Sequence, residues 1–430
     1  MRRRFLLSVL ASDLAALTLA FSAGLWLAFG EPRPWEVRLP STAPTSIWPF
    51  ATILVGGVLL GSLLSARMWG NATPRPSYGR ALAIGGFTLA FAAVGVAVGR
   101  PYYSSAVLVV TIGAWLVLAV AHRAVRRQRP WTERMVVVTN EKGLVDDLRS
   151  AAHADVVAVF DPADAPPEGI DHDGTVLVVD LRPVMTDKMA QFISSWNLAG
   201  YPVRSLTSVY EEHTGRLPIV HLAEGWELTA PVERNEYASL KRAIDVVLTV
   251  GFAPIWIPLM VIVWVAVRLD SPGPAIYTQE RVGRGGKPFT LYKFRTMVPD
   301  AERHGPRFAT PDDHRLTRVG RWLRRFRADE IPQLLNVFKG DLSLVGPRPE
   351  RPVFTRRFDL NIPFYQYRHL VRPGVTGWAQ VNYGYADDEE QTVDKLTYDL
   401  YYVKHMSPWL DAQILGRSIW TVLSGFGARY

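Results

Sequence analysis

Two adjacent carboxylates, Asp329 and Glu330, are the residues in this sequence that are best placed for chemistry, because they follow an arginine-rich segment and precede Pro332. Proline is tolerated in the first turn of a helix, so the pair is expected at the start of a helix. A helix N-terminus and nearby arginines would keep Asp329 ionised, so that it could bind a divalent cation or act as a nucleophile. A helix-capping acid is the alternative, which one acidic pair does not exclude.

The arginine-rich segment before this pair, residues 316–327, has the pattern of an amphipathic helix. Apolar residues recur at helical spacing and arginines take the other positions: Leu316, Val319, Leu323 and Phe326 against Arg318, Arg321, Arg324, Arg325 and Arg327. Such a helix suits a membrane interface, where the apolar stripe reaches the headgroup boundary and the arginines meet lipid phosphates or an anionic substrate. A solvated basic face is the alternative.

Three further segments carry residues that could bind a substrate. Pro347 and Pro349 lock the backbone around Arg348, which makes its guanidinium a fixed fork for a phosphate. The basic, glycine-rich segment 281–287 could cradle phosphate or form a hairpin tip. Trp378 and the tyrosines of 395–402 are expected to be core or interface anchors rather than substrate platforms.

The first part of the chain, residues 1–130, is predicted to form a four-helix transmembrane domain. Four apolar runs are long enough to cross the bilayer: 5–29, 47–66, 81–99 and 103–121. A cleaved signal peptide competes for the first run, but that run is too long for a signal core. Arginines in alternate connections place both ends of this domain in the cytoplasm. Asp13, inside the first run, is expected to make a packing contact between helices rather than form a functional site.

Residues 131–235 are predicted to form a small Rossmann-like α/β domain. Strands are expected at 135–139, 156–160 and 175–180, and helices at 143–152 and 186–198. A nucleotide site is disfavoured, because the turn after the first strand holds one glycine, Gly143, and an acid, Glu141.

Charge and composition support three units. Of the 430 residues 48% are hydrophobic, the mean hydropathy is +0.06, and the absence of cysteine excludes disulfides, thiolate zinc sites and iron–sulfur clusters. The net charge is +10 for residues 1–130, −9 for 131–235 and +7 for 236–430. The acidic middle unit is therefore the one expected to sit free in water.

The third unit, residues 236–430, begins with an apolar run at 244–267 that is long enough to be a fifth span. Pro254 and Pro258 interrupt the run, so a bend is expected. A full crossing would also move many basic residues to the far side of the membrane, against the positive-inside tendency. A re-entrant helix–break–helix satisfies both observations, and a kinked full span is the alternative.

From Lys241 to the C-terminus the sequence resembles the bacterial sugar transferase family, the polyprenyl-phosphate sugar-1-phosphate transferases. The motifs that carry the resemblance are, in order, KRAIDVV, SPGPAIYTQERVG, YKFRTM, TRVGRWLRRFRADEIPQLLNVFKGDLSLVGPRPERP, YRHLVRPGVTGWAQV and KLTYDLYYVKH. Together with the four predicted spans and the α/β unit, they resemble the long-form members that prime exopolysaccharide, capsule or O-antigen synthesis.

The resemblance implies a covalent mechanism. It makes Asp329 the nucleophile and Glu330 its partner, with Mg²⁺ near Asp329, and it places Lys293, Arg324 and Arg348 at matching basic positions. The implied reaction moves hexose 1-phosphate, glucose 1-phosphate by the resemblance to the exopolysaccharide members, from a UDP-sugar to undecaprenyl phosphate and releases UMP. A membrane scaffold or regulator without activity and a transporter are the rival functions.

The fold class that follows is an α-helical membrane protein with α/β cytoplasmic parts, ending in a monotopic catalytic domain. The family also implies a re-entrant helix, whose break is commonly Ser-Pro, whereas this chain has Ala253-Pro254. The bacterial inner membrane is the expected location, with the catalytic domain on the cytoplasmic face. UDP-sugar, undecaprenyl phosphate and the lipid bilayer are the expected partners, a homodimer is expected by analogy, and no nucleic acid is expected.

Overall fold

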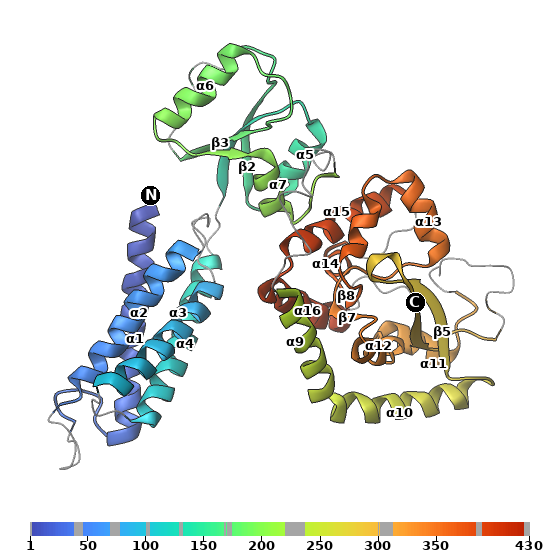
Figure 1. Cartoon of the computed structure of the whole chain (residues 1–430), viewed down its shortest axis with the longest axis horizontal. Coiled ribbons are helices and arrows are strands. Elements are labelled where there is room, and N and C mark those ends of the chain that lie inside the picture. The colour runs from blue at the N-terminus through green and yellow to red at the C-terminus, as the bar shows by residue number, and fades with distance from the viewer. Residues whose placement is uncertain are drawn as a thin grey trace. The chain divides into compact units, whose positions relative to one another are not determined.

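The computed structural model describes residues 2–37, 46–68, 78–99, 104–128, 132–166, 169, 174–219, 237–299, 301, 313–383 and 389–424. The chain divides into two compact units, Met1–Trp131 and Thr132–Tyr430, which are shown with their element labels in Figure 1. The predicted domain boundaries near 130 and 235 lie outside the described residues.

The first unit consists of helices: α1 (Arg2–Phe29), α2 (Trp48–Met68), α3 (Tyr78–Gly99) and α4 (Ser105–Gln128). Helix α1 packs against α4 and α2 against α3 around a shared apolar core. By length and composition, each of these four helices could cross a membrane, and in the described part of the chain a fifth helix, Ala253–Asp270, meets the same criterion. The chain is thus mostly helical, with five candidate membrane helices.

Asp13 makes the packing contact that was expected of it. Its two carboxylate oxygens accept hydrogen bonds from Arg123 Nη1 and Nη2 at 2.8 and 2.7 Å. The indole of Trp115 donates to the Asp13 carbonyl at 2.9 Å. Both charged side chains are almost completely buried, so the pair joins α1 to α4 inside the helical unit.

The second unit begins with a parallel sheet. Its elements are β1 (Glu133–Val138), α5 (Lys142–Ser150), β2 (Ala154–Phe160), β3 (Thr175–Val179), α6 (Asp187–Leu198), β4 (Val203–Ser205) and α7 (Leu206–Thr214). The strand order is β2-β1-β3-β4 with all neighbours parallel. Helices α5 and α7 cover one face and α6 the other, which explains why β1 and β3 are runs of apolar residues without alternation. The predicted strands and helices are confirmed, and β4 and α7 are additional elements.

Ion pairs fill the edge of this sheet where β1 and β3 end. Arg182 donates to Asp180 Oδ2 at 3.2 Å and to Glu141 Oε1 at 3.0 Å, and Thr139 donates to the same Asp180 oxygen at 3.0 Å. A ligand in a parallel α/β sheet would bind at this edge. Here the cation of Arg182 already has two carboxylate partners.

The remainder of the second unit is α9 (Tyr237–Gly251), α10 (Ala253–Asp270), β5 (Ile276–Val282), η3 (Arg284–Gly286), β6 (Pro288–Phe294), α11 (Arg318–Arg325), η4 (Ala328–Glu330), α12 (Gln333–Lys339), β7 (Ser343–Val345), α13 (Pro352–Asn361), η5 (Tyr365–Leu370), β8 (Gly374–Thr376), α14 (Trp378–Asn382), α15 (Glu389–His405) and α16 (Pro408–Ser424). Strands β5 and β6 form an antiparallel hairpin, and the segment 281–287 is its tip. Strands β7 and β8 pair in parallel.

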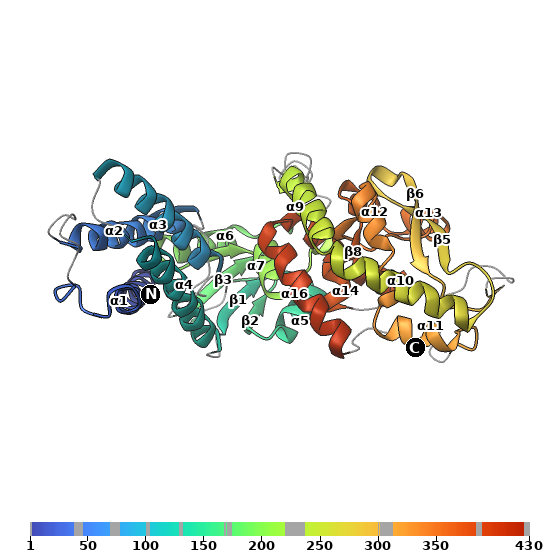
Figure 2. The ribbon, with the colours of Figure 1, turned by 90° about the horizontal axis from the view of Figure 1, so that it is seen from below.

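The predicted bend in the apolar run is present. Helix α9 ends at Gly251, Phe252 has a non-helical conformation, and α10 begins at Ala253 with Pro254 in its first turn. Pro258 lies inside α10 and does not end it. Figures 1 and 2 show α10 along the outside of the unit. Only Val263 and Val267 of α10 are buried, which leaves most of its apolar surface uncovered.

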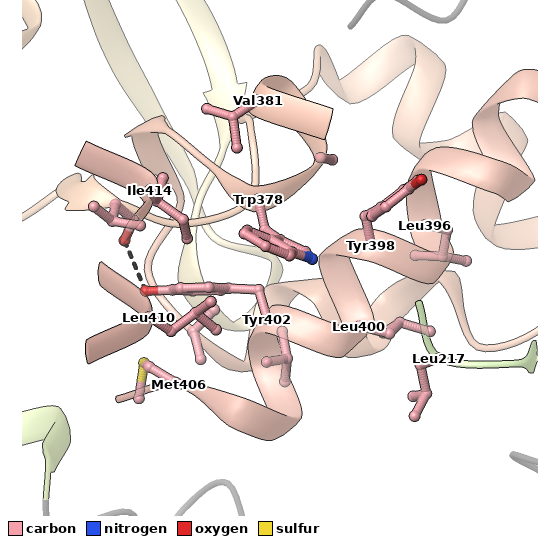
Figure 3. Close-up of a cluster of buried hydrophobic side chains, with 14 of the residues drawn as sticks. Leu217, Trp378, Val381, Leu396, Tyr398, Leu400, Tyr402, Met406, Leu410 and Ile414 are labelled. Carbon is pink, nitrogen blue, oxygen red and sulfur yellow. Dashed lines mark hydrogen bonds between the residues drawn. The ribbon is translucent and has the colours of Figure 1, made fainter. Parts of the chain in front are cut away.

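The main core of the second unit lies between α9, α14, α15, α16 and η5 (Figure 3). Tyr402 is at its centre and donates to the carbonyl of Val345 in β7 and to Asp411 in α16. Asp411 also accepts hydrogen bonds from Tyr237 and Lys241 of α9. Buried polar groups are retained where their hydrogen bonds are satisfied, and this cluster fixes the base of α9 to the strand that leads toward Arg348.

The acidic middle segment does not form a separate compact unit, because it packs against the segment that follows it. Glu211 of α7 is buried against α15, where it accepts hydrogen bonds from Lys404 Nζ and His405 Nε2, both at 2.7 Å. Trp378 Nε1 donates to the Gly215 carbonyl at 2.8 Å, and Leu217 N donates to the Thr397 carbonyl at 3.0 Å. The net charge of the α/β segment did not indicate this contact, because it depends on a single buried acid, Glu211, that binds two basic side chains of α15. Trp378 is the interface anchor that was expected.

Candidate active site

Asp329 and Glu330 lie in a single 3₁₀ turn, η4, between α11 and α12. Arg327 precedes the turn with φ of 52°, a left-handed conformation that is uncommon for residues other than glycine. The amide of Glu330 donates back to the Arg327 carbonyl at 3.1 Å. The pair therefore precedes α12 instead of occupying its first turn, because Pro332 is the N-cap of that helix.

Glu330 is already paired. Its Oε1 accepts hydrogen bonds from Lys293 Nζ at 3.0 Å and from Arg348 Nη2 at 3.1 Å, and the side chain is 9% exposed. Burial would raise the pKa of Glu330, but Lys293, Arg348 and Arg327 outweigh burial and hold the pKa well below its usual range. Glu330 is thus a fixed anion that orients two cations.

Asp329 differs from its neighbour. Its side chain is half-buried, and within the described residues no group donates a hydrogen bond to its carboxylate or forms an ion pair with it. Burial and the charge of Glu330 raise the pKa of Asp329 to about 6, although Lys293, Arg324 and Arg348 act in the opposite direction. The arginines were expected to lower the pKa of Asp329, but burial and Glu330 have the larger effect. With a pKa of about 6, Asp329 is still mainly ionised at pH 7.

The structure brings all five of the sequence-derived site residues together. Lys293 comes from β6, Arg348 from the loop after β7, and Arg324 from α11, where its Nε donates to Thr296 Oγ1 at 3.0 Å. All three cations interact electrostatically with Asp329. Thr296 was not predicted as part of the site, although it lies in the YKFRTM motif, and no sequence pattern signals the conformation of Arg327. Pro254 is in the first turn of α10 and belongs to the bend.

The amphipathic pattern of α11 corresponds to two surfaces. Leu316 and Leu323 are buried in the protein, where Leu323 packs with Val263 and Val267 of α10. Trp322 and Phe326 are exposed and their rings lie 4.4 Å apart. The apolar stripe expected at the membrane thus packs inward, except for Phe326, and the outward apolar surface is the Trp322–Phe326 pair.

The carboxylates of the site fit a magnesium ion that takes most of its ligands from water and substrate phosphates. No cluster of three or more acidic or histidine side chains that could hold a metal occurs among the described residues. Mg²⁺ is commonly bound through one or two carboxylates, with water and substrate phosphates as its other ligands. The unpaired carboxylate of Asp329 meets that requirement, and Glu330 has its oxygen engaged by Lys293 and Arg348.

This arrangement is suited to attack on a phosphorus atom. The carboxylate of Asp329, which has no partner among the described residues, could act as an oxygen nucleophile, and the cations beside it could stabilise the negative charge of a transferring phosphoryl group. Lys293 and Arg348 need no reorganisation for this role, because Glu330 already holds them. The geometry supports phosphoryl-group chemistry.

Comparison with known proteins shows where the similarity lies. A family model described as "Bacterial sugar transferase" matches residues 236–425. Among the relatives, a UDP-N-acetylgalactosamine-undecaprenyl-phosphate N-acetylgalactosaminephosphotransferase of Aeromonas hydrophila is 46% identical over 257 residues, which cover 59% of this chain and 60% of the relative. A UDP-glucose:undecaprenyl-phosphate glucose-1-phosphate transferase of Escherichia coli (strain K12) is 40% identical over 189 residues, 44% of this chain and 40% of the relative.

A third relative, named "Uncharacterized sugar transferase EpsL", of Bacillus subtilis (strain 168), is 41% identical over 192 residues, 44% of this chain and 89% of the relative. The chain thus spans about three fifths of the Aeromonas relative and two fifths of the Escherichia relative. The match of 257 residues is longer than the segment after residue 235, so that similarity extends into the α/β segment.

Proposed function

The chain belongs to the bacterial sugar transferase family, and on that premise we propose that it transfers a hexose 1-phosphate group from a UDP-sugar to undecaprenyl phosphate. The observation that carries the proposal is the contrast within the acidic pair. Asp329 is mainly ionised at pH 7 and has no partner among the described residues, whereas Glu330 binds Lys293 and Arg348 beside it. The product would be a polyprenyl-diphospho-sugar, the first intermediate of an exported polysaccharide.

The proposed reaction has two displacement steps. A carboxylate oxygen of Asp329 attacks the β-phosphorus of the donor, the bond between that phosphorus and the bridging oxygen breaks, and UMP leaves with this oxygen. A phosphate oxygen of undecaprenyl phosphate then attacks the same phosphorus, and the Asp329 carboxylate leaves. Atoms and charge balance without a redox partner.

The basic residues stabilise charge in both steps. Glu330 holds Lys293 and Arg348, which would face the phosphoryl oxygens, and Arg324 adds a third cation near Asp329. Mg²⁺ held by Asp329 and donor phosphates would neutralise part of the diphosphate charge. A covalent carboxyl intermediate would explain why Asp329 has no partner in the part of the chain that the structure describes.

The sugar is a narrower proposal. The sequence motifs favour glucose, and the Escherichia relative is named for UDP-glucose. The Aeromonas relative is named for UDP-N-acetylgalactosamine and has the higher identity, 46% against 40%. Both donors therefore belong in the test, and glucose 1-phosphate remains our first proposal.

The proposed arrangement places three domains at the bacterial inner membrane: residues 1–130, 131–235 and 236–430. Helices α1–α4 would cross it, and α9 and α10 would enter and return on the cytoplasmic face, where the catalytic domain lies. The break at Phe252 and the uncovered apolar surface of α10 support this arrangement. A homodimer is proposed by analogy with the family.

Topology can be tested directly because the chain contains no cysteine. Single cysteines at Ser271, after α10, and at Glu280, in β5, should react with a membrane-impermeant maleimide only in inside-out vesicles. Reaction in right-side-out vesicles would show that α10 ends outside and that α9 and α10 form a kinked full span.

The activity test incubates the purified chain, Mg²⁺ and undecaprenyl phosphate with a panel of UDP-sugars and follows UMP release. UMP from one donor that disappears in Asp329→Asn would support the reaction class, the donor and the nucleophile together. Equal release by the variant would remove Asp329 from the mechanism. No release from any donor would favour the scaffold function.

A further inference from the structure

The loop that carries Arg348 is held by three consecutive main-chain carbonyls. The carbonyl of Arg348 accepts a hydrogen bond from Arg368 Nη2 at 2.9 Å. The carbonyl of Pro349 accepts one from Arg281 Nη1 at 3.0 Å, and that of Glu350 accepts one from the amide of Val282 at 3.0 Å. Side chains and backbone from two distant segments, β5 and η5, therefore determine where this loop lies.

Arg368 is the most deeply buried of these donors. Its side chain is 2% exposed, and its Nη2 also binds Asp399 Oδ2 of α15 at 2.7 Å. Its Nη1 donates to the hydroxyl of Tyr365 at 2.7 Å. A buried ion pair has a large desolvation cost, so it does not by itself argue for stability. The hydrogen bond from this guanidinium to the Arg348 carbonyl instead argues for a role in holding the loop.

Ion pairs of Glu350 add further contacts at this end of the loop. Glu350 binds Lys395 of α15 at 2.6 Å and lies 3.8 Å from Arg281. Burial would raise the pKa of Glu350, but Lys395, Arg368 and Arg281 hold it at about 2, so the carboxylate stays ionised. Helix α15 thus contributes two side chains to these contacts. Lys395 binds Glu350 of the loop, and Asp399 binds Arg368, which in turn binds the Arg348 carbonyl.

We infer that Arg368, with Asp399 as its counter-ion, is a positioning residue that fixes the guanidinium of Arg348 against Glu330 and the donor phosphates. Arg368 acts through the Arg348 carbonyl and needs no contact with substrate. The inference rests on the proposed function of Arg348. Pro347 and Pro349 restrict the backbone conformation of the loop itself. The hydrogen bond from Arg368 to the Arg348 carbonyl fixes the position of the loop relative to η4.

The physical reason is the steep dependence of catalysis on position. A cation stabilises a transferring phosphoryl group only where its N–H groups meet the developing charge. A displacement of about 1 Å can lower a rate about 100-fold. The 3.1 Å contact of Arg348 with Glu330 would be lost by a shift of that size.

The experiment is a double-mutant cycle on UMP release by the full-length chain. Arg348→Gln, Arg368→Gln and the double variant are compared with wild type, together with Arg368→Lys, which keeps a charge beside Asp399 but loses the fork. Arg242→Gln is the matched control, because Arg242, like Arg368, donates to main-chain carbonyls of a distant segment, in its case those of Val337 and Phe338. Thermal unfolding is measured for every variant.

If Arg368 acts through Arg348, its effect should vanish when Arg348 is absent. We expect kcat/KM to fall about 100-fold for Arg348→Gln and about 10-fold or more for either Arg368 variant. The double variant should lie within about threefold of Arg348→Gln. Losses that multiply in the double variant, or an Arg368→Lys variant within about twofold of wild type, would overturn the inference. The lysine variant carries the test if Arg368→Gln does not fold.

A readout without turnover separates this inference from the proposed function. Amide hydrogen exchange in residues 345–351 should be faster in Arg368→Lys than in wild type and unchanged in Arg242→Gln. Unchanged exchange in Arg368→Lys would overturn the positioning role even in an active enzyme. If wild type releases no UMP from any donor, the proposed function fails, and the exchange result still decides what Arg368 does to the loop.

Discussion

Residue by residue, the site depends on the different surroundings of two adjacent acids. Glu330 has two cations within hydrogen-bond distance, whereas Asp329 has none in the described part of the chain. The same carboxyl chemistry therefore gives one fixed anion, Glu330, and one carboxylate, Asp329, that we propose as the nucleophile. The sequence placed the pair beside arginines but could not assign these environments, because they depend on Lys293 and Arg348, which lie in other elements.

This contrast predicts different behaviour of the two variants when donor is present without acceptor. The Asp329→Asn variant should show no increase in intact mass, since it lacks the nucleophile. The Glu330→Gln variant should still gain the mass of a phosphosugar, at a rate about 10- to 100-fold lower, because the amide oxygen can accept only weakly from its two cations. Intact-protein mass spectrometry measures both, and a mass gain in Asp329→Asn would contradict the assignment.

His369 is a second residue whose surroundings set a measurable property. Burial and the adjacent Arg368 lower the pKa of His369 to about 3, and the side chain packs beside Tyr365. The unfolded chain takes up this proton near pH 6.5 and the folded chain does not, so folding stability should fall as the pH drops from about 6.5 toward 3. The slope for one such group is at most about 1.4 kcal/mol per pH unit.

The test compares unfolding midpoints between pH 7.5 and 5 for wild type and His369→Gln. The variant should lose less stability on acidification than wild type does, because its amide does not titrate. His314→Gln, at an exposed histidine, is the control and should behave like wild type. Identical pH dependence in all three proteins would show that His369 is protonated in the folded chain.

At the scale of elements, the bend between α9 and α10 shows what proline can predict. Two prolines in one apolar run indicated an interruption, and the structure places it at Phe252, before Pro254, while Pro258 remains inside α10. Proline is tolerated in a first turn, so the two positions are not equivalent. The indole of Trp256 donates to the Thr249 carbonyl in the last turn of α9 at 2.8 Å, a contact that spacing alone does not indicate.

Trp256 supplies a donor at a break where the family commonly has serine and this chain has Ala253. The last carbonyls of a helix lack partners within it. Trp256→Phe should therefore leave the Thr249 carbonyl without a hydrogen bond and lower the free energy of unfolding by about 1 kcal/mol. We expect a lower unfolding midpoint in detergent for this variant. Trp264→Phe is the matched control, since Trp264 lies on the same helix and is half exposed. Equal midpoints for both variants would contradict this role.

The contact between α7 and α15 was not predictable from charge, because Glu211 and Glu212 look alike in the sequence. In the structure Glu211 binds Lys404 and His405 of α15, whereas Glu212 pairs with Arg204 inside the α/β segment. The periodicity of α7 decides which acid faces the partner helix, and the partner is known only from the fold.

Glu211→Gln should therefore loosen the docked α/β segment, while Glu212→Gln should not. Burial opposes ionisation of Glu211, but His405 and Lys404 lower its pKa, so the variant loses charge-assisted hydrogen bonds worth about 1.5–3 kcal/mol each. Hydrogen exchange in α7 and α15 should become faster in Glu211→Gln alone. Equal exchange in both variants would mean that Trp378 and the backbone contacts hold the junction without Glu211.

At the scale of the whole molecule, the order of parts was readable and the docking was not. Apolar run lengths predicted four helices, and alternating apolar strands and amphipathic helices predicted the parallel sheet, because both are local properties. Charge blocks suggested three units, yet the second and third pack as one compact unit. Contacts between segments distant in sequence, such as Arg368 with Asp399, require the fold.

Residues 237–430 should retain transferase activity without the preceding segments. All five site residues lie in this part, and the Bacillus relative consists almost entirely of the matching segment. The fragment should be less stable, because Trp378 and Lys404 lose their partners in the α/β segment. UMP release per mole of fragment measures the retained activity. An inactive but folded fragment would show that the α/β segment contributes to the site.

The buried pair of Asp13 and Arg123 has a consequence for biogenesis. The two residues lie 110 positions apart, in the first and the last helix of the helical unit. If the helices enter a bilayer in the order of synthesis, α1 carries an uncompensated acid until α4 emerges, and an unpaired charge in hydrocarbon is costly. Arrival of Arg123 would then be the closing step, and a product released before that step would keep the acid of Asp13 without its partner.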